Sequence, residues 1–348
     1  MNSFDPNGIG QPNGRYFALP YTVEEAEIVL IPVPWDVTTS YHTGASRGPQ
    51  AILEASTQVD LFDFSIENAW QIKIGTHPIN EGIYSRSIEL RNDAEHVIRH
   101  LEEGGDPDEK VIVKRIQRIN EASAELNDWV RFHSLDYLDK GKLVGIVGGE
   151  HSVPLGLIKV LSGRYANFGV LHIDAHADLR EAYEGFTHSH ASIMYNVLHE
   201  VENIERLVQV GIRDLSQDEM CFADQDDRIV MFNDEALSEA MFSGKNWQQL
   251  CNDIINKLPE NVYVSFDIDG LSPDLCPNTG TPVPGGLSFQ QATYLLRTLA
   301  KSGRRIIGFD LNEVASNENI DLDANVGARL LYKLCCYSHI ANNNLIKT

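Results

Sequence analysis

Acids and imidazoles recur at every second position in two short segments of the chain. The first segment reads His172-Ile-Asp-Ala-His-Ala-Asp178, and in the second Asp267 and Asp269 close an apolar run. Side chains two residues apart in an extended chain point to one face, so each set can converge on a common point. Buried carboxylates without a counter-charge are very costly, and divalent metal ions supply that charge. The two segments together predict a metal site.

A further candidate ligand is His151, which follows the apolar run 143–148 and two glycines. The six candidate ligands are then His151, Asp174, His176, Asp178, Asp267 and Asp269. They are too many for one transition metal ion and fit two divalent ions about 3.5–4 Å apart. Oxygen-rich ligation with one imidazole per ion favours Mn²⁺, with Ni²⁺, Co²⁺ or Zn²⁺ able to compete. A single Asp-x-Asp pair is also compatible with helix capping or surface ion pairs; two clusters together are not easily explained in that way.

Strand-length apolar runs must position these ligands. Eight of them begin near Ile28, Gln71, Leu143, Phe168, Leu207, Ile229, Val262 and Ile306, with helical or loop material between most of them. Such alternation predicts an α/β protein with a mainly parallel sheet. Both acidic clusters follow buried runs, which places them at the carboxyl ends of strands, where open α/β sheets keep their sites.

No linker or internal repeat divides the chain, so we expect one domain over residues 1–348. We expect an N-terminal arm over 1–24, a partly helical elaboration over 81–142 and a polar tail over 342–348. Within the elaboration, a helix is predicted to begin at Asp106-Pro107 after a polar stretch. Its apolar residues, at helical spacing, are Ile112, Ile116, Ile119, Leu126 and Val130.

Composition limits the classes of partner. The net charge of −22 argues against nucleic acid and anionic membranes and makes a cationic substrate plausible, although solubility alone would also explain it. Five cysteines without a C-x-x-C pair indicate a reducing compartment. No secretory signal and no 18-residue apolar run is visible, so we expect a cytoplasmic protein.

Three motifs carry a resemblance to the ureohydrolases, the family of arginases and agmatinases. They are Gly-Gly-Glu-His151, Asp174-Ala-His176-Ala-Asp178 and Ser265-Phe-Asp-Ile-Asp-Gly-Leu-Ser-Pro273. The segments Tyr41–Ile52 and Gly280–Gly286 are similar to agmatinases as well, so the resemblance runs from Ile28 to about Val314. It implies a three-layer αβα arginase-like fold with a mainly parallel eight-stranded sheet. It also implies a homo-oligomer, a trimer or hexamer.

The resemblance also implies roles for single residues. It places His151 and Asp178 on one ion and His176 and Asp269 on the other, with Asp174 and Asp267 bridging. His190 matches the histidine that shuttles protons or supports substrate, and Glu313 the acid that holds the guanidinium group. Water activated by the ions would attack the guanidinium carbon and release urea and an amine.

The expected substrate is a small cationic guanidino compound. The run from Asp178 to His190 is most similar to agmatinases, which favours agmatine, cleaved to putrescine and urea. It lacks the Ser-Gly-Asn stretch of arginases, which disfavours arginine. Arg180 would suit 4-guanidinobutyrate if it faced the pocket, or be neutral in effect if paired with Glu181 or Glu184. Free guanidine is a further alternative substrate. The protein could instead be a metal-dependent amide hydrolase or a non-catalytic relative. His188 is expected to be a loop residue.

Overall fold

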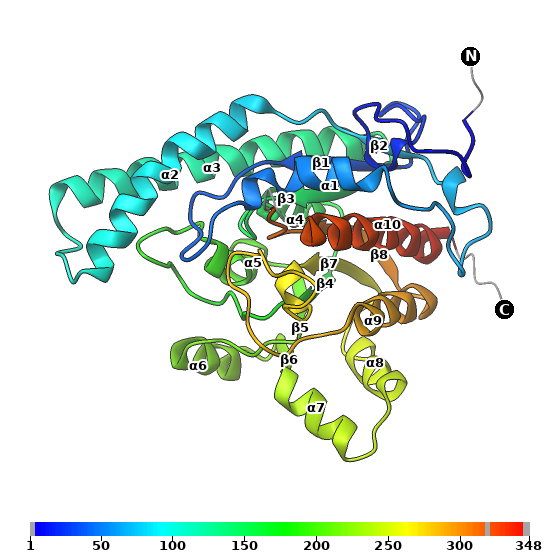
Figure 1. The fold of residues 1–348 in the computed structure, drawn as a ribbon. Helices are drawn as coiled ribbons and strands as arrows, with labels where there is room; N and C mark the ends of the chain where they lie inside the picture. Colours follow the sequence, from blue (N-terminus) through cyan, green and yellow to red (C-terminus); the bar gives the residue numbers. More distant parts are fainter. Residues whose placement is uncertain (1–3, 317–320, 344–348) are drawn as a thin grey trace.

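One sheet of eight parallel strands, covered by helices on both faces, forms the centre of the molecule (Figure 1). The computed structural model describes residues 4–316 and 321–343. Its strands are β1 (Ile28–Val33), β2 (Ile74–Thr76), β3 (Leu143–Gly148), β4 (Phe168–Ile173), β5 (Ile204–Val210), β6 (Ile229–Phe232), β7 (Asn261–Phe266) and β8 (Arg305–Leu311). Their order is β2-β1-β3-β8-β7-β4-β5-β6, and every pairing is parallel. The predicted fold class is confirmed.

The strands are mainly apolar because helices cover both faces of the sheet. Leu30 packs with helices on one face and Val29, its neighbour in β1, packs with helices on the other. The helices are α1 (Gly48–Ser56), α2 (Glu81–Glu102), α3 (Lys110–Asp139), α4 (Leu155–Ser162), α5 (Ile193–Glu200), α6 (Gln217–Gln225), α7 (Asp234–Phe242), α8 (Trp247–Ile255), α9 (Phe289–Lys301) and α10 (Leu322–Asn343). Helices α2 to α5 cover the face of the sheet that carries Val29, and α1, α8, α9 and α10 cover the face that carries Leu30.

The elaboration over 81–142 is more helical than expected. The stretch 81–105, expected to be polar, is mostly the helix α2, which begins with Asn80 as its cap and buries Leu90, Ala94 and Val97. The prediction that the next helix begins at Asp106-Pro107 was wrong, since α3 begins at Lys110.

A turn replaces the predicted start of that helix. The carboxylate of Asp106 accepts the N–H of Asp108, and its carbonyl accepts the N–H of Glu109, so the Asp caps a turn between α2 and α3. The apolar stripe of α3 was predicted correctly at four positions, which are buried: Ile112, Ile119, Leu126 and Val130. Ile116 is partly buried.

The expected arm and tail lie partly outside the described residues. In the arm, Tyr16 and Phe17 are buried in the core on the side of α1 and α10. Of the tail, Asn342 and Asn343 still belong to α10, and 344–348 lie outside the described residues. In the described part of the chain, no helix has both the length and the apolar character needed to cross a membrane.

Helix α4 packs so closely on α3 that residue 156 must be glycine. A Cβ atom at Gly156 would lie 2.4 Å from the carbonyl oxygen of Asn127, whereas one at Gly163, just after α4, would meet nothing nearer than 3.5 Å. We expect Gly156→Ala to lower the free energy of unfolding by about 1–3 kcal/mol, because backbone must move. Urea unfolding of this variant and of Gly163→Ala as control checks this; equal stabilities would contradict the packing described.

Candidate metal centre

The predicted ligands meet at the carboxyl ends of the central strands. Strands β3, β8, β7 and β4 are neighbours in that order. His151 follows β3, Asp174 follows β4, Asp267 follows β7 and Glu313 follows β8. Parallel strands place their carboxyl ends at one edge of the sheet, so residues far apart in the sequence share one site.

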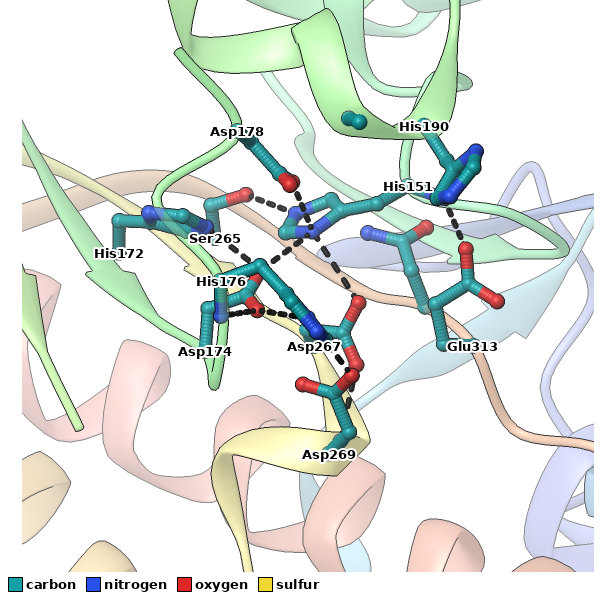
Figure 2. Close-up of polar contacts among 12 residues, drawn as sticks. His151, His172, Asp174, His176, Asp178, His190, Ser265, Asp267, Asp269 and Glu313 are labelled. Atoms are coloured by element: carbon teal, nitrogen blue, oxygen red, sulfur yellow. Dashed lines mark hydrogen bonds and ion pairs between the residues drawn. The ribbon is translucent and has the colours of Figure 1, made fainter. Parts of the chain in front are cut away.

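Two adjacent groups of possible metal ligands lie at this edge, and Asp174 belongs to both (Figure 2). One group holds His151, His172, Asp174 and Asp178, and the other holds Asp174, His176 and Asp269. The sixth predicted ligand, Asp267, lies beside His151. At the first group, Nδ1 of His151 lies 3.0 Å from Oδ2 of Asp174, 3.4 Å from Oδ2 of Asp178 and 3.3 Å from Oδ2 of Asp267. At the second, Nδ1 of His176 lies 3.1 Å from Oδ2 of Asp269 and 3.5 Å from Oδ1 of Asp174. Asp174 thus offers one oxygen to each histidine, as a bridging ligand would.

The four carboxylates of the cluster have histidines beside them but no lysine or arginine partner among the described residues. All four carboxylates are buried. Burial and the charge of Asp174 raise the pKa of Asp178 well above its usual value, and burial and Asp269 do the same for Asp267. Burial opposes protonation of His151, yet the carboxylates outweigh it and hold its pKa well above normal. Divalent cations fit this donor set and its charge.

Two residues of the site adopt left-handed backbone. Asp178 has φ 55° and Glu313 has φ 60°, conformations that cost a non-glycine residue about 1–3 kcal/mol. Other contacts hold them: the carbonyl of Asp178 accepts two N–H groups from the start of α5, and the N–H of Glu313 donates to Gly149 at 2.8 Å. The left-handed backbone conformation thus directs both carboxylates into the site.

His190 and Glu313 lie beside the cluster. His190 lines a cleft of about 160 Å³ together with His176 and Asp178. Burial, with the charge of His176, lowers its pKa to about 3, so its imidazole is neutral. Oε1 of Glu313 accepts the N–H of His151 at 2.8 Å, whereas its buried Oε2 has no partner among the described residues. Burial, with the charge of Glu150, raises the pKa of Glu313.

The mouth of the cleft carries charges of both signs. Arg180 lies 3.4 Å from Glu219 and stacks on Tyr183, so the pairing with Glu181 or Glu184 considered from the sequence is not found. Asp214 also lines the cleft, is exposed, and has no side-chain partner within the described ranges. His188 lies 3.9 Å from Glu200 and outside both metal groups, as expected for a loop residue.

Comparison with known proteins assigns the family. Residues 26–336 match the family model described as the arginase family. The chain belongs to the arginase family. It is 33% identical over 309 residues to an N(1)-aminopropylagmatine ureohydrolase of Thermus thermophilus, covering 89% of each chain. It is 28% identical to an agmatinase of Pyrococcus horikoshii, covering 89% of this chain and 91% of that one.

A solved relative has the same fold. The crystal structure of an agmatine ureohydrolase of Thermoplasma volcanium aligns with a TM-score of 0.71 at 19% identity, over 95% of this chain and 96% of that chain. Membership of the arginase family makes the protein a hydrolase of guanidino compounds. The His and Asp cluster fits the metal binding expected of an arginase-family enzyme.

Sequence reasoning missed a histidine that supports this centre. His172 is fully buried in β4, and its Nε2 lies 2.8 Å from Oδ2 of Asp174. The side-chain amide of Gln209 donates to Nδ1 of His172 at 3.0 Å, so Nε2 carries the proton and donates it to Asp174. The signal was present, since His172 continues the same two-residue alternation, but this histidine orients a ligand rather than serving as one.

A second missed pair lies behind His151 in this arginase-family site. Nε2 of His151 donates to the hydroxyl of Ser265 at 2.8 Å, and this hydroxyl donates to Asp310 at 2.9 Å. The chain of hydrogen bonds leaves Nδ1 of His151 facing the carboxylates. Ser265 lies on the alternating face of β7, but nothing in the sequence pattern indicated Asp310.

Replacing His172 with Phe tests its supporting role. The ring shape is retained but the hydrogen bond to Asp174 is lost, so we expect divalent-ion affinity to fall about 10–100-fold. Competition with a chelating dye measures this. His199→Phe, which changes a histidine stacked on Tyr195 outside both metal groups, is the control. Equal ion affinities in the two variants would contradict the role assigned to His172.

Proposed function

We propose that the protein is a two-metal ureohydrolase whose substrate is a linear guanidino compound with a cationic tail, agmatine or N(1)-aminopropylagmatine. The products would be urea and the corresponding amine. The observation that carries the proposal is the buried, unpartnered Oε2 of Glu313 next to the six-ligand cluster. A buried carboxylate oxygen without a donor is costly, and the N–H groups of a guanidinium would satisfy it.

The residues divide the chemistry between them. When bound, the two ions supply a water nucleophile that is reactive at neutral pH. Glu313 orients the guanidinium by charge-assisted hydrogen bonds and so presents its carbon to that water. His190 lines the cleft next to His176 and Asp178, where it can take a proton from the attacking water and pass it to the departing amine nitrogen as the carbon–nitrogen bond breaks.

The charges at the mouth of the cleft support a cationic tail. The positive charge of Arg180 is offset by Glu219, while the exposed carboxylate of Asp214 remains available to an ammonium group. The Thermus thermophilus and Pyrococcus horikoshii relatives are named for substrates of this kind. A carboxylate tail, as in 4-guanidinobutyrate, would instead meet a net negative rim.

We further propose finer features of the enzyme. Oxygen-rich ligation supports Mn²⁺ as the native ion, with Ni²⁺ or Co²⁺ as substitutes. We also propose that His151, Asp174, His176, Asp178, Asp267 and Asp269 bind the two ions as expected from the sequence. The remaining proposals are one domain over residues 1–348, a homo-oligomer that is a trimer or hexamer, and a cytoplasmic location.

Urea release by the Mn²⁺-loaded protein tests the substrate class. We expect the largest kcat/KM with agmatine or N(1)-aminopropylagmatine, because Asp214 faces the cationic tail. Arginine, 4-guanidinobutyrate and free guanidine should be cleaved at least about tenfold less efficiently, the loss expected when a charged tail is mismatched or absent. A higher kcat/KM with any of these three would overturn the substrate class but not the chemistry.

Replacing Glu313 with Gln tests the guanidinium anchor. The amide offers one donor where the guanidinium needs an acceptor, so kcat/KM for urea release should fall about 100-fold or more. Metal content should remain at two equivalents because Glu313 is not a predicted ligand. Glu181→Gln, at an exposed position, is the control. Full guanidino turnover by Glu313→Gln would contradict the role of Glu313 as the guanidinium anchor.

A further inference from the structure

Two loops hold His190 in place. One is the segment 36–44 after β1, and the other is the segment 183–190 that carries His190 itself. The N–H of His190 donates to the hydroxyl of Thr38 at 3.0 Å, and this hydroxyl lies 3.4 Å from Nδ1 of the ring. The N–H of Thr38 donates in turn to Glu150 at 2.6 Å. The position of the ring therefore depends on where both loops are held.

Helix α2 fixes the loop 36–44 on either side of Thr38. The hydroxyl of Ser87 accepts the N–H of Asp36 at 3.0 Å, and both residues are buried. The guanidinium of Arg91 donates to the carbonyl of Val37 at 3.1 Å and also to the carbonyl of Thr39. The backbone groups just before and just after Thr38 are therefore bound to α2.

Helix α3 fixes the loop 183–190 in a similar way. The side-chain amide of Asn120 accepts the N–H of Thr187 at 3.0 Å and donates to the carbonyl of Gly185 at 3.1 Å. Ile116, one turn earlier, packs so closely on Gly185 that a Cβ atom there would lie 2.8 Å from its side chain. The amide of Asn120 thus binds the backbone on both sides of Phe186. Phe186 lies three residues before Ser189, which directly precedes His190.

The two helices are joined to each other. Arg115 and Arg118 of α3 form ion pairs with Asp93 of α2, and Arg118 also pairs with Glu89. Figure 1 shows α2 and α3 running alongside one another over the edge of the molecule that holds β1. A displacement of either helix would therefore be transmitted to the loop that the other helix holds.

We propose that the α2–α3 hairpin, residues 81–139, is a clamp that sets the position of His190, and that Arg91 and Asn120 are its positioning residues. Neither side chain lines the cleft, and both bind the loops by hydrogen bonds to the backbone. The inference rests on the proposed role of His190 in proton transfer. A small misplacement of a catalytic group reduces turnover much more than it reduces stability.

Asn120→Leu removes both hydrogen bonds but keeps the number of side-chain heavy atoms and the branching at Cγ, and Asn120→Asp keeps the acceptor for the N–H of Thr187. Gln117→Leu is the matched control, because Gln117 is an exposed amide on the same helix whose contact, to Glu121, lies within α3. The measurements are kcat and KM for urea release, bound Mn²⁺, melting temperature, and hydrogen exchange of peptides covering 183–190.

We expect Asn120→Leu to lower kcat about tenfold or more, with Asn120→Asp intermediate. The KM, the metal content of two ions and the melting temperature should stay near the values of Gln117→Leu. Hydrogen exchange of the peptides covering 183–190 should become faster. The clamp proposal would be overturned if Asn120→Leu kept the kcat and the hydrogen exchange of the wild-type protein. It would also be overturned if the loss of kcat were matched by a loss of bound metal. If Asn120→Leu does not fold, the same test uses Arg91→Gln, with kcat and the hydrogen exchange of peptides covering 36–44 as the measurements. If the wild-type protein releases no urea from any guanidino compound, the proposed function fails, whereas exchange still shows whether Asn120 holds the loop.

Discussion

Four buried carboxylates within a few ångströms of one another form the interaction on which the site depends. Asp174 lies between the two histidine-centred groups, and no Lys or Arg of the described residues pairs with the set. Such a cluster is unfavourable in a folded protein unless cations occupy it. The parallel sheet makes the cluster geometrically feasible, because four neighbouring strands end at one edge. Metal binding and folding of this edge are therefore coupled.

Much of the surrounding polar structure serves to orient the ligands. His172 orients Asp174, and Ser265 with Asp310 orients His151, so the metal-facing atoms are fixed by groups that do not face the metal. The strained backbone at Glu313 has the same effect on the guanidinium anchor. The loops at His190 are held from outside by the α2–α3 hairpin. His151, Asp174, Glu313 and His190 are thus each held by contacts with residues that are not predicted ligands.

The sequence predicted what depends on local pattern. All eight strand starts were placed within three residues of the structure, because buried parallel strands are short apolar runs that differ from their flanks. Five candidate ligands were found because alternation in an extended chain is visible without tertiary information. The sixth, His151, was found because it follows an apolar run and two glycines, and the structure brings all six together.

The missed features depend on tertiary contacts. Helix α2 was taken for a polar stretch because its buried stripe is narrow, and Asp106 was taken for a helix cap although its carboxylate closes a turn. Arg180 pairs with Glu219, 39 positions further along the chain, rather than with its sequence neighbours. The supports from Asp310 and Asn120 likewise join residues from different elements. No period or motif encodes such contacts.

Anomalous diffraction from crystals of the Mn²⁺-loaded protein is the most direct test of the metal centre. Two peaks are expected about 3.5–4 Å apart, one beside His151 and the other beside His176, with the carboxylate of Asp174 between them. A single peak at full loading, or peaks away from this cluster, would contradict the two-metal site and the hydrolytic chemistry based on it.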